Sequence, residues 1–184
     1  MKLLSAIMLF TFIGSAYPSD TPEDATNKFY SAIVTGRYQA CLPDQSELDR
    51  LAPLMSRRLT GLLQDALAYR EQYAKEHPPK TNKDGVPPTF YKPPFIDGDC
   101  FSSNVEGAKR FTLGKSEKTA TGYRIELHLT YFDSTRPDEK PFEWIDAVIV
   151  IKEDDRFVVD DMEFLGTWSY GNHGTLSKRL HYRE

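Results

Sequence analysis

The segment from Phe142 to Lys152 constrains the fold most, because it is apolar on both faces of an extended chain. Successive side chains of a strand point to opposite faces. One face carries Phe142, Trp144, Val148 and Val150, and the other carries Ile145, Ala147, Ile149 and Ile151. A strand that is covered on both sides lies in the interior of a sheet. We therefore predict that residues 142–152 form the central strand.

Other segments with strand character lie on either side of this one in the sequence. They are residues 108–117, 123–132 and 157–164, with a possible short strand at 100–103. In the second of them, apolar residues alternate with polar ones, so one face is buried and the other is polar or lines a site. Turn residues separate the segments, which predicts an antiparallel meander of four to five strands.

Two helices are predicted ahead of the strands. Thr21 followed by Pro22 is typical of a helix start, and Gly36 is typical of a helix end. From Met55 to about His77, apolar residues recur in steps of three and four, which predicts a long amphipathic helix. Helices followed by a strand meander predict an α+β fold in which N-terminal helices pack on a curved antiparallel sheet.

A short helical piece is expected between these two helices. Ser46 together with Asp49 matches a capping box, and Pro53 would interrupt or restart the helix.

The first sixteen residues have the organisation of a signal peptide. Lys2 gives a charged start, residues 3–13 are apolar, and Gly14, Ser15 and Ala16 supply the small residues of a cleavage site. The apolar run is shorter than the roughly twenty residues that span a bilayer. We therefore expect cleavage near Ala16, a periplasmic location without a membrane anchor, and a single mature domain of residues 17–184.

The two cysteines, Cys41 and Cys100, both belong to the expected mature chain. In an oxidising compartment the default expectation is a disulfide. A bridge would close a loop of about 60 residues and stabilise the fold by on the order of 4 kcal/mol in the chain-entropy model. The alternative is a free thiol, although the chain has no Cys-x-x-Cys motif.

A proline-rich segment at 78–99 separates the helical part from the strands. It contains six prolines and the aromatic residues Phe90, Tyr91 and Phe95. Such a long loop can be a simple connection between the helices and the strands. The alternative is a functional segment that acts as a lid or binds a partner.

Several short motifs occur in an order that resembles a known family. They are Phe29-Tyr30, residues 51–56, residues 97–100, the strand at 156–164 and the closing glycine-containing segment 171–180. In this order they resemble the exported bacterial domains of unknown function related to the YbjP and YqhG proteins, which are similar to the nuclear transport factor 2-like (cystatin-like) cone fold. The resemblance implies a cone-shaped α+β fold and a periplasmic address, and it carries over no catalytic residues.

One pair of residues is a candidate for catalysis. Asp146 shares a strand face with apolar neighbours, which raises a carboxyl pKa and suits a general base. His128, on the neighbouring strand, would reach Asp146 if the register places both on one face. An isomerase- or hydrolase-like enzyme is therefore the alternative to a binding protein. No metal or cofactor is expected, because the histidines and the acidic residues lack zinc or calcium spacing.

The leading expectation is non-catalytic binding of a small ligand or a periplasmic protein, including an immunity or inhibitor role. The expected pocket residues are aromatic, because such side chains give contact area at modest entropic cost: Phe90, Tyr91, Phe95 and Trp144. A nucleic-acid partner is disfavoured, because the formal net charge is −4 and no basic stripe is present.

Overall fold

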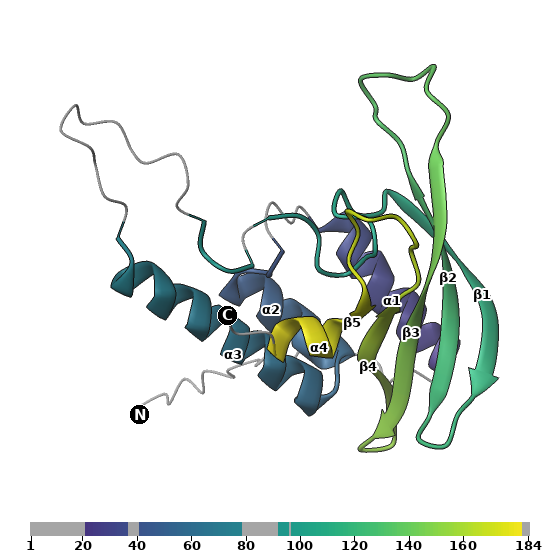
Figure 1. Ribbon diagram of the computed structural model, residues 1–184. Helices are drawn as coiled ribbons and strands as arrows, with labels where there is room; N and C mark the ends of the chain where they lie inside the picture. Colours follow the sequence, from purple (N-terminus) through teal and green to yellow (C-terminus); the bar gives the residue numbers. More distant parts are fainter. Residues whose placement is uncertain (1–20, 37–40, 79–91, 96, 182–184) are drawn as a thin grey trace, which may run out of the picture.

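Five antiparallel strands form one open sheet, and the helices lie against one of its faces (Figure 1). The computed structural model describes residues 21–36, 41–78, 92–95 and 97–181. The strands are β1 (Arg110–Lys118), β2 (Tyr123–Tyr131), β3 (Phe142–Glu153), β4 (Arg156–Phe164) and β5 (Gly174–Thr175). They are ordered β1-β2-β3-β4-β5. The predicted α+β class and the central position of residues 142–152 are confirmed.

The predicted short strand at residues 100–103 is wrong, and the fifth strand comes instead from residues 174–175. The backbone around residue 100 is bonded to side chains rather than to a neighbouring strand. The Asn172 amide donates to the carbonyl oxygens of Asp99 and Ser102, at 2.7 and 2.6 Å. The Ser103 N–H donates to the Asp146 carboxylate at 2.7 Å. These bonds replace a ladder and hold the segment in turns.

The helices begin and end largely where local chemistry predicts. α1 (Pro22–Thr35) is capped by the Thr21 hydroxyl, which accepts a hydrogen bond from the Asp24 N–H, and Gly36 follows its last residue. α2 (Gln45–Leu51) has a capping box, but its cap is Asp44 rather than the expected Ser46. The 3-10 helix η1 (Ala52–Leu54) follows it and contains proline near its start.

α3 (Arg57–Glu76) is hydrogen-bonded to the sheet at its beginning. The Ser56 hydroxyl caps the helix and donates a hydrogen bond to the Asp160 carboxylate of β4 at 2.6 Å. The Arg58 guanidinium donates to the same carboxylate at 2.8 Å. The C-terminal half of α3 runs away from the sheet (Figure 1). Tyr69 and Tyr73 on that half are only partly buried, so the apolar stripe of α3 extends farther than the core that covers it.

The core lies between the helices and the inner face of the sheet. α1 crosses this face and contacts β1 to β4. The largest side chains in the core are fully buried, among them Phe29, Tyr30, Phe101, Leu59, Leu127 and Met162. The Tyr30 hydroxyl donates to the Phe101 carbonyl oxygen at 3.0 Å, which satisfies its buried polar atom.

The closing segment completes both the sheet and the core. β5 pairs with the end of β4, and α4 (Leu176–His181) follows directly. Leu176 and Leu180 are buried. The Ser177 N–H donates to the Asp161 carboxylate of β4 at 3.0 Å. The segment therefore seals the core, as its residue pattern indicates.

The disulfide between Cys41 and Cys100 is confirmed. Their Cα atoms are 4.6 Å apart, and the bond joins positions separated by 59 residues. Both half-cystines are buried. The bond ties the chain just ahead of α2 to the turns that precede β1.

Candidate binding site

Asp146 is buried on the inner face of β3 and is held entirely by structural hydrogen bonds. Its carboxylate accepts from the Ser103 N–H at 2.7 Å, from the Ser103 hydroxyl, and from the Trp144 indole N–H at 3.0 Å. It also accepts from the Leu165 N–H at 3.0 Å. Burial raises the pKa of Asp146, and these hydrogen bonds act against that rise. The side chain joins three segments of the chain, and its lone pairs are occupied.

His128 is not brought together with Asp146. In the β2–β3 register, Asp146 is opposite Leu127, whereas His128 is opposite Ile145. Neighbouring positions alternate between faces, so His128 lies on the outer face, where it is exposed. Proton transfer needs hydrogen-bond reach or one bridging water. The two side chains are therefore not a catalytic couple, and this part of the sequence interpretation is wrong.

Of the four aromatic residues expected in one pocket, the two that are described, Phe95 and Trp144, line different cavities. Trp144 packs with Phe142 and Trp168, with ring centroids 5.6 and 6.3 Å away. Phe95 lies in the segment beside α3 and α4 and has a positive φ of 58°. Phe90 and Tyr91 lie outside the described residues, as do the expected signal peptide and most of the proline-rich segment.

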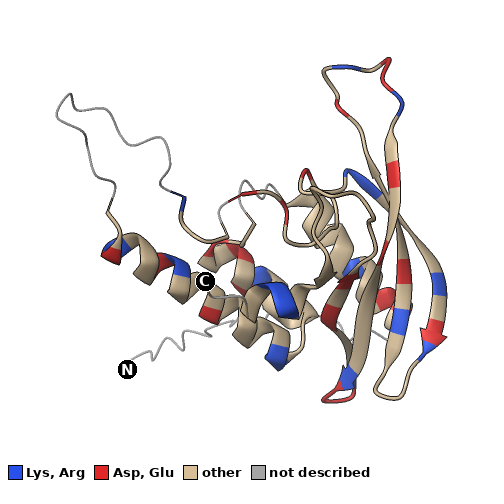
Figure 2. Ribbon diagram, viewed as in Figure 1, with Lys and Arg blue, Asp and Glu red and all other residues tan. Residues whose placement is uncertain are grey.

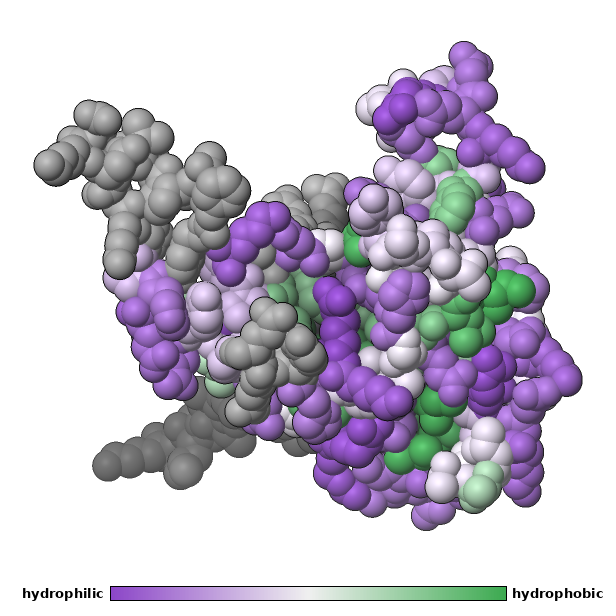
Figure 3. All heavy atoms as spheres, viewed as in Figure 1, coloured by the Kyte–Doolittle hydropathy of each residue, from purple (hydrophilic) through white to green (hydrophobic). Residues whose placement is uncertain are grey.

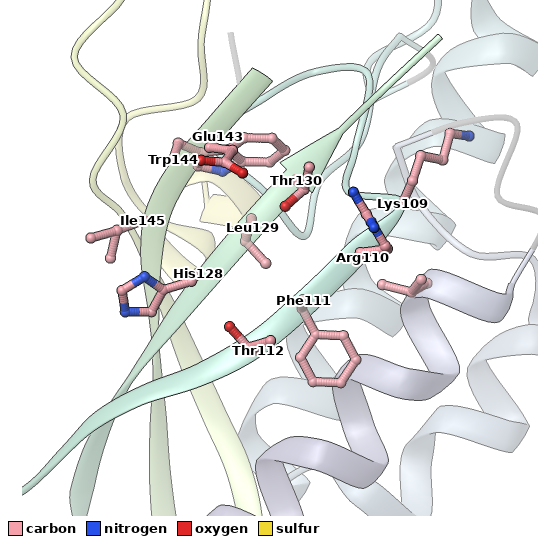
Figure 4. A pocket seen from close by; sticks show the side chains of 11 residues that line it. Lys109, Arg110, Phe111, Thr112, His128, Leu129, Thr130, Glu143, Trp144 and Ile145 are labelled. Atoms are coloured by element: carbon pink, nitrogen blue, oxygen red, sulfur yellow. The ribbon is translucent and has the colours of Figure 1, made fainter. Parts of the chain in front are cut away.

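A cavity of about 870 Å³ lies on the sheet and includes both Trp144 and His128 among its lining residues. Figure 4 shows Lys109 and Arg110 towards one end of this cavity and His128 with Ile145 towards the other. Asp146 is not among the described residues that line it. Ile145 is 41% exposed, and hydrophobic side chains reach the surface over β2 and β3 (Figure 3). The charged residues that line this cavity, Lys109, Arg110 and Glu143, have both signs, so the cavity does not favour ligands of one charge.

A second cavity, of about 560 Å³, lies between α3, α4 and the segment 92–95. One part of its wall is aromatic, formed by Tyr69 and Tyr73 of α3 and by Phe95. The remaining lining is mostly basic: Lys92, Lys178, Arg179 and His173, with Pro94 beside them. No acidic residue is among the described residues of this lining. Figure 2 shows the basic residues of α4 next to α3.

A third cavity, of about 590 Å³, adjoins the second and shares Arg179 with it. This cavity is acidic, because Asp97, Asp99 and Glu106 line it. Burial raises the pKa of Asp99 to about 6, with a further rise from the charge of Asp146. A hydrogen bond from the Phe101 N–H and the charges of Lys109 and Arg179 act in the opposite direction. Arg179 therefore separates an acidic cavity from a basic one.

Of the residues expected in a pocket, Phe95 lines the second cavity, whereas Arg179 and the two tyrosines of α3 were not among the expected site residues. The sequence pattern assigns these tyrosines to the apolar stripe of the helix. The stripe extends farther than the core that covers it, and this excess is the signal that could have indicated a binding surface. No sequence pattern indicated that Arg179 is partly buried.

Within the described ranges, no group of three or more His, Cys, Asp or Glu side chains is placed to hold a metal ion. No helix in the described part of the chain is long and apolar enough to cross a membrane. In comparisons with known proteins, no family model, no curated protein and no solved structure matches the chain.

Proposed function

We propose that this chain is an exported, non-catalytic binding domain that holds a small ligand in the cavity between α3, α4 and residues 92–95. The observation that carries the proposal is the aromatic wall of this cavity. Tyr69 and Tyr73 lie on the part of α3 that leaves the core, and Phe95 faces the same space. Ligand sites are typically cavities of about 300–1,000 Å³ with apolar walls and a few polar groups.

The geometry of Phe95 supports the same proposal. A bulky residue with positive φ is uncommon, and such strain persists where the surroundings over-determine it. Here the backbone adopts a φ of 58°, and the side chain is packed at the edge of the core. The conformation places an aromatic ring beside α3 at the cost of backbone strain, which suits a recognition role.

The non-catalytic part of the proposal is supported by Asp146. The strongest candidate base has its lone pairs occupied by four donors and has no histidine on its face of the sheet. Export is supported by the signal-peptide pattern, by the buried disulfide and by the resemblance to exported domains of unknown function. N-terminal sequencing of protein secreted by a bacterial host would test cleavage near Ala16.

Binding can be tested with N-phenyl-1-naphthylamine, an uncharged aromatic fluorophore that brightens in apolar sites. The oxidised mature chain should bind it, and Tyr73→Ala should weaken binding about tenfold, which is about 1.4 kcal/mol. Alanine is the best helix former, so this variant should keep α3 intact. Phe95→Ala should have a similar effect.

Phe132→Ala is the matched control, because Phe132 is an exposed aromatic residue directly after β2 and should leave the affinity unchanged. The proposal would be refuted if the probe does not bind. It would also be refuted if only the control variant weakens binding, which would place the site near the end of β2.

A further inference from the structure

The side chain of Arg179 is unusual because one of its donors is buried without an acceptor. Its Nε is the only such side-chain nitrogen or oxygen among the described residues. Burial lowers the pKa of this guanidinium, and the charge of Asp99 partly restores it. An unsatisfied buried donor costs about 1–3 kcal/mol, and more when it is charged. A buried donor without an acceptor calls for an explanation, and a partner bound at the cavities that Arg179 lines would supply one.

The surroundings of Arg179 indicate the charge of that partner. On the side of the second cavity, Lys92 and Lys178 add positive charge, and the described lining contributes no carboxylate. Lys92 is paired with Asp97 at 2.6 Å, whereas no ion pair joins Arg179 to a carboxylate within the described residues. A guanidinium presents its donors as a planar fork that matches carboxylate and similar oxyanions.

The aromatic wall of the same cavity gives the other half of the ligand chemistry. Tyr69 and Tyr73 have ring centroids 6.3 Å apart, and the Tyr73 ring stacks on His77 at 4.1 Å. The rings therefore form a row along α3 with room for an apolar body beside it. The sheet cavity differs in carrying both signs of charge, and the acidic cavity differs in carrying three carboxyl groups.

We infer that the ligand of this cavity is an organic anion, with an oxyanion group held by Arg179 and an apolar body against the tyrosines of α3. The inference rests on the proposed function, because it specifies the ligand class of the same site. Lys178 and Lys92 contribute longer-range attraction, whereas Arg179 makes the directional contact.

Two matched probes test the inference. 1-Anilinonaphthalene-8-sulfonate has the ring system of N-phenyl-1-naphthylamine with an added sulfonate, so the two differ in the anionic group. The wild-type protein should bind the sulfonate at least about tenfold more tightly than the neutral probe. Arg179→Gln should remove most of this difference and leave the affinity for the neutral probe within about twofold.

Arg110→Gln is the control variant, because Arg110 lines the sheet cavity and should leave the preference unchanged. A salt titration of the wild-type protein gives a second test that needs no variant. Raising NaCl to about 0.5 M should weaken binding of the sulfonate selectively, because exposed charges are screened. Circular dichroism of each variant establishes that it is folded.

Equal affinity of the wild-type protein for the two probes would overturn the inference and leave the proposed function standing. A loss of preference in Arg110→Gln rather than in Arg179→Gln would also overturn it. If neither probe binds, both the proposed function and this inference are overturned.

Discussion

Replacing Asp146 by asparagine tests whether its carboxylate has a structural role, because a structural carboxylate should contribute to the free energy of unfolding. The carboxylate accepts four hydrogen bonds, from the Ser103 N–H and hydroxyl, the Trp144 indole and the Leu165 N–H. Asparagine has nearly the same shape but only one acceptor oxygen, so its NH₂ group would face donors. Two buried donors would lose their acceptor at about 1–3 kcal/mol each.

Removal of a buried charge offsets part of that cost, because burial already raises the pKa of Asp146. We expect Asp146→Asn to lower the free energy of unfolding by about 2–4 kcal/mol, a large share of a typical total of about 5–15 kcal/mol. Urea unfolding followed by tryptophan fluorescence measures it. Both tryptophans of the chain lie near this site, since Trp144 donates to Asp146 and Trp168 packs on Trp144.

Glu143→Gln is the control, because Glu143 is exposed on the same strand and surface substitutions usually change stability by less than about 0.5 kcal/mol. If Asp146→Asn changes the free energy of unfolding by less than about 1 kcal/mol, the structural interpretation of this residue is wrong.

Three further predictions concern the disulfide, the acidic cavity and the closing helix. Cys41→Ser combined with Cys100→Ser should fold but lose about 4 kcal/mol, or roughly 10 °C in Tm by calorimetry, and an unchanged Tm would contradict this. Folding raises the pKa of Asp99 from 3.8 to about 6, so ionised Asp99 destabilises the fold above about pH 6 and this penalty fades as the pH falls towards 4. Asp99→Asn should therefore be more stable than wild type by up to about 3 kcal/mol at pH 8, with a smaller gain at about pH 5; a gain that grows towards low pH would refute the sign. Leu180→Ala should lose about 2–5 kcal/mol in urea unfolding, and a loss below about 1 kcal/mol would mean that α4 is not part of the cooperative unit.

Those parts of the fold that depend on local residue patterns were predictable. The central strand follows from its two apolar faces, and the first helix follows from Thr21 and Pro22. Helix caps are formed by residues close in sequence, and the apolar periodicity of a strand is read from consecutive residues, so both patterns can be recognised without knowledge of the rest of the fold. The disulfide was predictable from the expected export and the presence of two cysteines, although its geometry was not.

Features that depend on distant residues were not predictable. Residues 100–103 have strand-like composition, yet Asn172 and Asp146 supply their hydrogen-bond partners from far along the chain. His128 and Asp146 lie on neighbouring strands, as expected. His128 is opposite Ile145 rather than Asp146, and this shift of one position places the two side chains on opposite faces of the sheet. The role of Arg179 depends on two cavities that meet only in the folded chain.

The closing segment sets the order in which the domain can be completed. Before residues 174–180 join, the last two residues of β4, Glu163 and Phe164, are unpaired on the edge side, beside an apolar surface that Leu176 and Leu180 later cover. Exposed edges of this kind pair readily with other chains. During synthesis these residues follow all the other strands, so a nascent chain that already contains the meander still carries this hazard. The core is therefore completed last, when Leu176 and Leu180 dock with α4.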